Sequence, residues 1–137
     1  MVSKTLFSSA SVEWETPQDL FDRLHAKYQF TLDVCATKEN AKCAQYFDTS
    51  TDGLKQSWAG ERVWCNPPYG REIFDWVARC SAHSFAVMLL PARTDVRWWH
   101  DFVIPYGDVE FIKGRLKFGG HKNSAPFPSA VVVFGEP

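Results

Sequence analysis

The sequence predicts an α/β protein whose sheet is mainly parallel and closes in an antiparallel pair of strands. Two observations carry this prediction. The middle of the chain alternates short apolar segments, typical of buried strands, with segments whose apolar residues recur at helical spacing. Two more strand-like segments, 108–118 and 129–135, then follow each other in hairpin-like succession. At 137 residues, we expect one domain over residues 13–137, preceded by a loose lead-in over residues 1–12.

The first helix is predicted in the segment WETPQDLFDRLHAKY, residues 14–28. Thr16 can cap it, Pro17 suits the first helical position, and Asp19 favours the first turn. One helical face then carries apolar residues: Leu20, Phe21, Leu24 and Tyr28. A strand is expected next, at 30–36. The polar segment 37–60 leaves room for a short strand near Tyr46–Phe47 and has an Asp52–Gly53 turn signal.

The second half of the chain continues this alternation. A strand is expected at 62–66, followed by an amphipathic helix whose buried face is Ile73, Trp76, Val77 and Cys80. The segment 84–91 is almost continuously apolar, as a strand covered on both faces would be. Thr94 can cap a further helix that runs to about Val103. The strands 108–118 and 129–135 finish the domain.

The formal net charge is −1, so the whole chain lacks the basic footprint typical of a duplex DNA binder. Its cations are unevenly placed, however, because the segment 111–127 contains no acid and four basic residues: Lys113, Arg115, Lys117 and Lys122. Such a segment suits salt-sensitive contact with DNA phosphates, and a solvated edge is the alternative. Arg93, which follows the strand 84–91, is expected either to touch a DNA phosphate or to pair with an acid.

The four cysteines include no C-x-x-C pair, so we expect no zinc or other metal site. Three of the four lie in apolar strand or helix contexts, and we interpret them as small buried hydrophobes in a reducing compartment. The longest apolar run, 85–91, is far too short to cross a membrane, and no signal peptide is recognised. The expectation is a cytoplasmic protein without a membrane or metal partner.

The segment CNPPYG, residues 65–70, gives the clearest chemical signal. Two prolines end the strand before them and fix the backbone direction. The side-chain oxygen of Asn66 and the backbone carbonyl of Pro67 can accept hydrogen bonds from the two N–H groups of a planar amine, which makes its nitrogen more nucleophilic. The ring of Tyr69 offers a surface on which a flat base can stack. In open α/β sheets ligands bind at the carboxyl ends of strands, where Asp33 and Arg93 are also expected.

These residues carry a resemblance to the phage-type DNA N-6-adenine methyltransferases, which runs from about Trp14 to Phe134. The matching segments are WETP, LDVCA, DGL, VWCNPPYG, VMLLPAR, GRLKFGG and VVVF. The resemblance implies a seven-stranded, Rossmann-like S-adenosylmethionine methyltransferase sheet, S-adenosylmethionine as cofactor and DNA as partner. It also implies a catalytic set, Asn66, Pro67, Pro68 and Tyr69, and a cofactor-binding set: Trp14, Thr16, Pro17, Asp33, Cys35, Ala36, Asp52 and Asn66.

Within the implied cofactor site, Asp33 would hold either the methionine end or a ribose hydroxyl. Asp52 would contact the cofactor's adenine or serve only as a turn residue. The segment 33–40 departs from many methyltransferases because it has no glycine.

Because the sequence is short, we expect no separate target-recognition domain. Sequence readout would therefore come from loops, an accessory protein or a homo-oligomer. The expected activity is N6 methylation of adenine in DNA, in the cytoplasm of a bacterial host. The alternatives are RNA adenine, a protein glutamine amide, cytosine N4, or a non-catalytic phage protein that binds DNA or a partner.

Overall fold

The computed structural model describes residues 14–121 and 123–137. The expected lead-in over residues 1–12 and the side chain of Lys122 lie outside the described residues. The elements follow one another as β1 (Leu32–Asp33), β2 (Val63–Cys65), β3 (Phe85–Pro91), β4 (Gly107–Phe111) and β5 (Ser129–Gly135), with the helices α2 (Gln18–Tyr28), α3 (Ile73–Ala82) and α4 (Ile104–Tyr106) between or before them. A single 3-10 turn, Gly53–Lys55, precedes β2.

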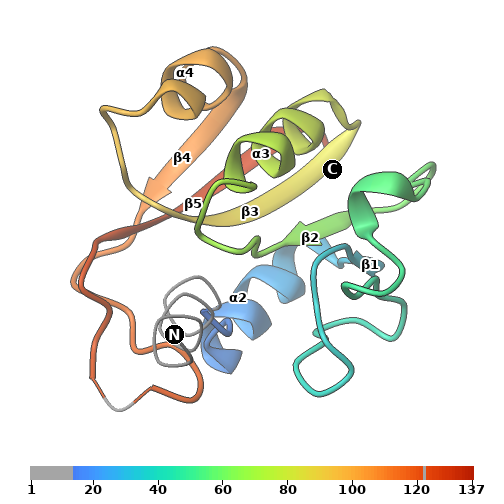
Figure 1. Cartoon of the computed structure of the whole chain (residues 1–137), viewed down its shortest axis with the longest axis horizontal. Helices are drawn as coiled ribbons and strands as arrows, with labels where there is room; N and C mark the ends of the chain where they lie inside the picture. The colour runs from blue at the N-terminus through green and yellow to red at the C-terminus, as the bar shows by residue number, and fades with distance from the viewer. Residues whose placement is uncertain (1–13, 122) are drawn as a thin grey trace, which may run out of the picture.

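The described strands form one sheet with the order β1-β2-β3-β5-β4 (Figure 1). The β1–β2 and β2–β3 pairings are parallel, whereas the β3–β5 and β4–β5 pairings are antiparallel. The prediction of a mainly parallel sheet was therefore wrong, because β5 inserts between β3 and β4 and runs against both. The antiparallel C-terminal pair is confirmed. The described residues form five strands, not the seven that the resemblance implied.

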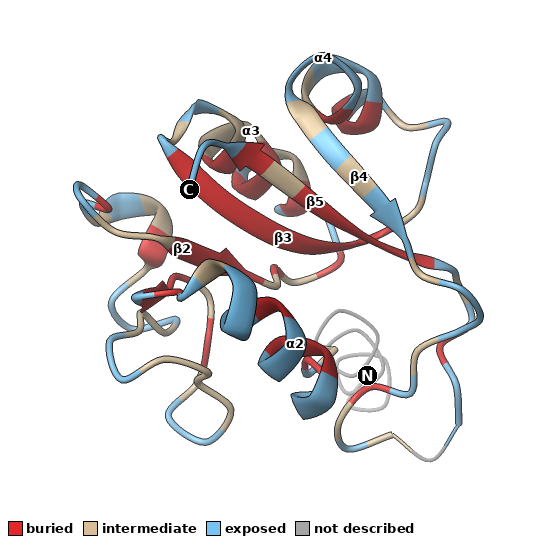
Figure 2. Ribbon diagram, turned by 180° about the vertical axis from the view of Figure 1, so that it is seen from behind, coloured by how far each residue is buried: buried red, intermediate tan, exposed pale blue. Residues whose placement is uncertain are grey.

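The helices cover both faces of the sheet. Figures 1 and 2 show α3 on one face and α2 on the other. Successive residues of β2 point to opposite faces, and Trp64 accordingly packs against Phe21 of α2, with ring centroids 5.4 Å apart. The next residue, Cys65, is fully buried and lies beside Cys80 of α3. The domain thus has three layers, with the sheet in the middle.

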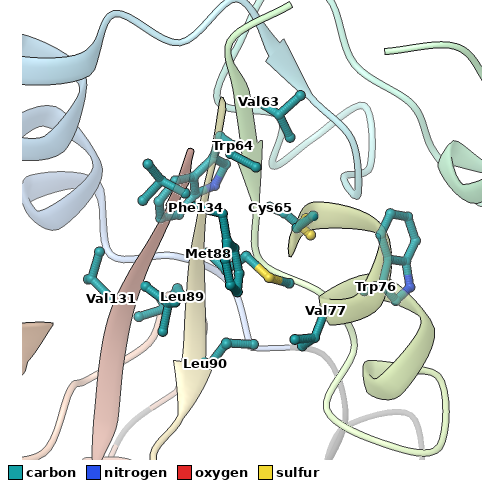
Figure 3. Packing of buried hydrophobic residues seen from close by; sticks show 14 of the residues in the cluster. Val63, Trp64, Cys65, Trp76, Val77, Met88, Leu89, Leu90, Val131 and Phe134 are labelled. Atoms are coloured by element: carbon teal, nitrogen blue, oxygen red, sulfur yellow. The ribbon is translucent and has the colours of Figure 1, made fainter. Parts of the chain in front are cut away.

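The core is centred on β3, whose seven residues are all buried. Its central residues Val87, Met88 and Leu89 pair with β5 on one side, and Val87 and Met88 also pair with β2 on the other. Figure 3 shows Met88 and Leu89 between residues of β2, β5 and α3. A strand covered on both faces and paired on both edges is the most rigid place from which to position groups at its carboxyl end.

Several predicted boundaries differ from the structure. The helix α2 begins at Gln18, one residue after Pro17, and Thr16 does not cap it because its hydroxyl accepts a hydrogen bond from Asn66 instead. The strand expected at 30–36 is only Leu32–Asp33, although Tyr46 does form a parallel bridge with Asp33.

Two further boundaries lie near the C-terminal part of the sheet. The strand expected at 108–118 ends at Phe111, and Gly114 beyond it has a positive φ of 78°. The helix expected from Thr94 begins at residue 97 and contains a π-helical stretch, Trp99–Val103, before α4.

Candidate functional site

The carboxyl ends of β1 and β2 open onto a cleft of about 180 Å³. Asp33 ends β1, and Asn66 with Pro67 and Pro68 follows β2 directly. Trp14 and Thr16, from the segment before α2, form another wall. The other residues that line the cleft are Glu15, Cys35, Ala36, Thr37, Asn40, Lys42, Thr49, Trp64 and Gly119. The structure therefore brings together most of the predicted catalytic and cofactor-binding residues at one edge of the sheet.

The side chain of Asn66 is held in one orientation. Its Nδ2 donates hydrogen bonds to the carbonyl oxygen of Trp14 and to Oγ1 of Thr16, the latter over 3.0 Å. A carbonyl oxygen can only accept, so the nitrogen must face this wall. The amide oxygen Oδ1 is then buried without a hydrogen-bond partner in the part of the chain that the structure describes. An unpaired buried acceptor is costly, and it is the group that a bound amine would satisfy.

Asp33 is a buried carboxylate at the end of β1, with 3% of its surface exposed. Its side chain accepts hydrogen bonds from the backbone N–H groups of Lys42, at 3.0 Å, and Cys35, at 3.3 Å. Desolvation nevertheless dominates and raises the pKa of Asp33 from 3.8 to about 6. A cationic or hydroxyl-bearing ligand beside it would stabilise the charged form, so this carboxylate is suited to bind one.

Tyr69 occupies a different position from the one predicted. Its ring is 4% exposed and does not line the cleft. The hydroxyl donates to the carbonyl oxygen of Leu89 over 2.9 Å, and the rings of Phe118 and Phe127 lie against it with centroid distances of 6.3 and 5.6 Å. The structure thus shows Tyr69 covered by the segment that joins β4 to β5, and its stacking role stays a prediction.

Trp14 connects this covering segment to the cleft. Its ring stacks on His121 with centroids 4.4 Å apart and meets Phe118 and Phe127 edge-on at 5.4 and 5.1 Å. The neighbouring Glu15 pairs with Gly119, whose N–H donates to the Glu15 carbonyl over 2.9 Å. The backbone that orients Asn66 is therefore fastened to the β4–β5 segment.

A second cavity, of about 290 Å³, adjoins the cleft and shares Cys35, Ala36 and Thr49 with it. Asp52, which the sequence singled out, lies on its wall. The other lining residues are Val34, Asp48, Gly53, Glu72 and Trp76. Asp52 has a left-handed backbone with φ of 56°, and its carboxylate accepts from the N–H of Leu54. Pro17 lines neither cavity.

Sequence reasoning missed the polar contributors between β1 and β2, notably Asn40, Lys42 and Thr49. They belong to the segment 37–60, which has no periodic pattern. Long-range contacts, among them the parallel bridge between Asp33 and Tyr46 and the bond from the Lys42 N–H to the Asp33 carboxylate, bring this segment back to the cleft. The single local signal was the T-x-x-N spacing, since Thr37 and Asn40 bond each other through backbone and side chain.

The predicted DNA-binding residues that the structure describes are exposed. Arg93, Lys113, Arg115 and Lys117 are exposed, and Arg115 also donates to the carbonyl oxygen of Ala125 at 3.5 Å. Within residues 14–121 and 123–137, none of the ion pairs involves these four cations. The guanidinium of Arg93 instead lies 6.0 Å from the centre of the Phe127 ring.

No cluster of His, Cys, Asp and Glu side chains among the described residues could hold a metal ion. No helix that the structure describes is long and apolar enough to cross a membrane.

The fold and the cleft define an α/β protein whose candidate site is centred on a half-buried carboxamide, Asn66, and a buried carboxylate, Asp33, at strand ends. Comparison with known proteins shows which family within this class the chain belongs to. A family model described as DNA N-6-adenine-methyltransferase (Dam) matches residues 3–135, so the chain belongs to this family.

Two relatives agree with this membership. The chain is 29% identical over 113 residues to the DNA N-6-adenine-methyltransferase of Haemophilus phage HP1, a match that covers 77% of this chain and 65% of the phage protein. It is also 32% identical over 65 residues to a protein of Escherichia coli (strain K12) named "Putative methyltransferase YfdM", covering 42% of this chain and 70% of that protein. The chain thus matches just under two thirds of the length of the phage relative.

Proposed function

We propose that this protein methylates N6 of adenine in DNA, with S-adenosylmethionine as the methyl donor. The observation that carries the proposal is the orientation of Asn66. Its nitrogen is fixed by Trp14 and Thr16, and its oxygen is buried without a partner in the described residues beside the Pro67–Pro68 backbone. Family membership supports the same reaction. We propose that the sheet is of the Rossmann-like methyltransferase type, which fits this activity.

The two adjoining cavities fit the proposed cofactor. S-adenosylmethionine supplies, when bound, an electrophilic methyl group on a sulfonium. The ligand also has an ammonium group, ribose hydroxyls and an adenine amino group, all of which suit acceptor side chains. Asp33 on the cleft and Asp52 on the second cavity provide such acceptors, and Trp14, Thr16, Cys35 and Ala36 form the walls near them. We infer that the cofactor extends across both cavities.

The chain's own contribution to the reaction is to activate and position the amine. The Asn66 oxygen and the Pro67 carbonyl accept hydrogen bonds from the two N–H groups of the adenine amino group. These bonds lower the conjugation of the amino nitrogen with the ring and expose the nitrogen lone pair. The prolines keep these acceptors in a fixed direction, so little reorganisation is needed at the moment of reaction.

Access of the base requires a change at the covering segment. An adenine flipped out of DNA can stack on Tyr69 only after Phe118 and Phe127 have moved from its ring. We propose that contact between phosphates and the exposed cations Arg93, Lys113, Arg115 and Lys117, together with Lys122, accompanies this movement. We propose that loops, an accessory protein or a second copy of the chain read the DNA sequence. We also propose that methylation takes place in the cytoplasm of a bacterial host, where the DNA is.

One experiment tests the proposed reaction. Purified protein is incubated with methyl-labelled S-adenosylmethionine and, separately, with DNA, RNA and protein acceptors, and the products are digested and identified. We expect N6-methyladenine in DNA, and a single-turnover rate about 10²–10³-fold lower in Asn66→Ala. Label in RNA or glutamine, or an Asn66→Ala protein as fast as the wild type, would overturn the proposal.

A further inference from the structure

A second buried polar group without a partner in the described residues belongs to Trp76, a residue that lines the second cavity. Trp76 is 4% exposed, and its indole N–H has no hydrogen-bond partner among the described residues. Figure 3 shows the Trp76 ring on α3, at the edge of the buried cluster. Because an unsatisfied buried donor opposes folding, its presence beside a cavity suggests that a ligand acceptor completes it.

Trp76 is held firmly in this position. Its ring stacks on that of Trp58 with centroids 6.4 Å apart and 12° between the planes. The indole N–H of Trp58 is satisfied, since it donates to the carbonyl oxygen of Gly53 over 2.9 Å. The Arg79 guanidinium lies 4.0 Å from the centre of the Trp58 ring and donates to the carbonyl oxygen of Leu54 over 2.7 Å. Of the two stacked indoles, one N–H is hydrogen-bonded and the other has no partner in the described residues.

The charge of the cavity limits what the ligand can be. Asp48, Asp52 and Glu72 line it, and none of its described lining residues is a Lys, Arg or His. A phosphate is disfavoured here, because the three acids outnumber the cation beside them, Lys55, whose Nζ lies 3.9 Å from the Asp52 carboxylate. A group that donates hydrogen bonds to carboxylates and accepts one from an indole is favoured, and a nucleoside without phosphate has both properties. The shared wall at Cys35, Ala36 and Thr49 connects this group to the cleft of Asp33 and Asn66.

From these observations we propose that the Trp76 indole N–H donates a hydrogen bond to the nucleoside half of the methyl donor and so selects a nucleoside-bearing ligand. This inference rests on the proposed function and adds a donor on α3 that the sequence pattern indicated only as a core residue. The cavity acids would accept from hydroxyl and amino groups of the same nucleoside.

The test uses Trp76→Phe, which keeps a flat apolar ring and removes the N–H. Binding of S-adenosylhomocysteine and of 5′-methylthioadenosine, which lacks the amino-acid part, is measured by calorimetry, and the thermal midpoint is measured without ligand. We expect both affinities to fall roughly tenfold, as for one lost hydrogen bond to a preorganised site. The ligand-free midpoint should stay the same or rise, because the unsatisfied donor is gone.

Trp58→Phe is the matched control, because it alters the other indole of the stacked pair. Removing its bond to Gly53 should lower the midpoint. If Trp76→Phe binds both ligands like the wild type, the inference is wrong while the proposed function stands. It is also wrong if the two variants lose stability and affinity alike, since disturbed packing would then explain both. If the wild-type protein binds neither ligand, the proposed cofactor site fails and the inference fails with it.

Discussion

The side-chain nitrogen of Asn66 lies 3.0 Å from the hydroxyl oxygen of Thr16 and donates a hydrogen bond to it. This contact joins the residue that follows β2 to a residue two positions before α2, fifty positions earlier in the chain. It gives Thr16 a function other than helix capping. The Trp14 carbonyl accepts a second hydrogen bond from the same nitrogen. Together the two contacts turn the Asn66 oxygen away from Trp14 and Thr16 and leave that oxygen as the group available to an amine.

Thr16→Val keeps the branched shape of the side chain and removes its hydroxyl. We expect the single-turnover methylation rate to fall about fivefold, because one net hydrogen bond of about 1 kcal/mol that orients Asn66 is lost. Thr16→Ser retains the hydroxyl and should stay close to the wild-type rate. Equal rates for the valine and serine variants would show that the Thr16 hydroxyl does not position Asn66.

The parts of the fold that were predictable from the sequence have strong local patterns. The helix α3 has apolar residues at helical spacing, so its buried face was predicted correctly, and β3 is continuously apolar, so its bounds were predicted almost to the residue. The strand β1 is shorter than predicted because the Asp33 carboxylate bonds the backbone of Cys35 and Lys42, which bends the chain into a loop. Such a competing side-chain bond has no periodic signature.

The site was predictable where it depends on strand ends and unpredictable where it depends on long-range packing. Asn66 and Asp33 follow apolar strands, and parallel strands bring their carboxyl ends together. The burial of Tyr69 depends on Phe118 and Phe127, about fifty to sixty residues further on. The indole of Trp76 was counted as one more apolar position of α3, because a sequence does not show whether a buried N–H finds a partner.

The raised pKa of Asp33 predicts how its variant changes stability with pH. The pKa is about 6 in the folded protein against an ordinary value of 3.8, so the folded state binds this proton more tightly than the unfolded state. The native protein therefore loses stability as the pH rises from about 4 to about 6, in total on the order of 2–3 kcal/mol. Asp33→Asn should remove this loss. In urea unfolding, the free energy of unfolding of the variant should exceed that of the wild type at pH 8 and be about equal to it at pH 4.

Binding gives the control for this prediction, because the charged carboxylate that destabilises the fold is the one proposed to hold the cofactor. The affinity of wild-type protein for S-adenosylhomocysteine should increase as the pH rises through about 6, and Asp33→Asn should bind more weakly at pH 8. An Asp33→Asn variant that is less stable than wild type at pH 8 would contradict the assigned cause, namely desolvation of the carboxylate.

A substitution at Gly53 tests whether the wall of the second cavity is needed for cofactor binding. A Cβ at this position would lie 2.1 Å from the carbonyl oxygen of Val34, which is a backbone atom that cannot turn aside. Gly53→Ala should therefore lower the free energy of unfolding by roughly 2–4 kcal/mol and weaken S-adenosylhomocysteine binding. Gly60→Ala is the control, since Gly60 has a positive φ of 77° but nothing within 4 Å of the added atom. Its cost should be about 1 kcal/mol, without a change in affinity.

Tyr69 must be tested with its burial in mind. Tyr69→Ala would leave a large hole in the core, so a loss of activity could come from unfolding. Tyr69→Phe keeps the ring and removes only the bond to the Leu89 carbonyl. We expect it to lower the free energy of unfolding by about 1 kcal/mol and to retain capture of the target base, read from 2-aminopurine fluorescence at the methylated position. A Tyr69→Phe protein that fails to capture the base would assign the essential role to the hydroxyl instead of the ring.

The exposed cations between β4 and β5 give a prediction that depends on charge alone. Lys113 and Lys117 are exposed, and neither takes part in an ion pair within the described residues. If each contacts one phosphate, Lys113→Ala and Lys117→Ala should each weaken DNA binding to a similar extent on different sequences. Each should also reduce the slope of log affinity against log salt by roughly one, because one fewer counterion is released. Lys27→Ala, at an exposed position on α2, is the control and should leave the slope unchanged.

The segment that carries Lys113 and Lys117 also places Phe118 and Phe127 over Tyr69. The two lysine variants should therefore also slow the appearance of the 2-aminopurine signal. Unchanged salt slopes in both lysine variants would mean that this segment does not face DNA and would leave the uncovering of Tyr69 to another contact.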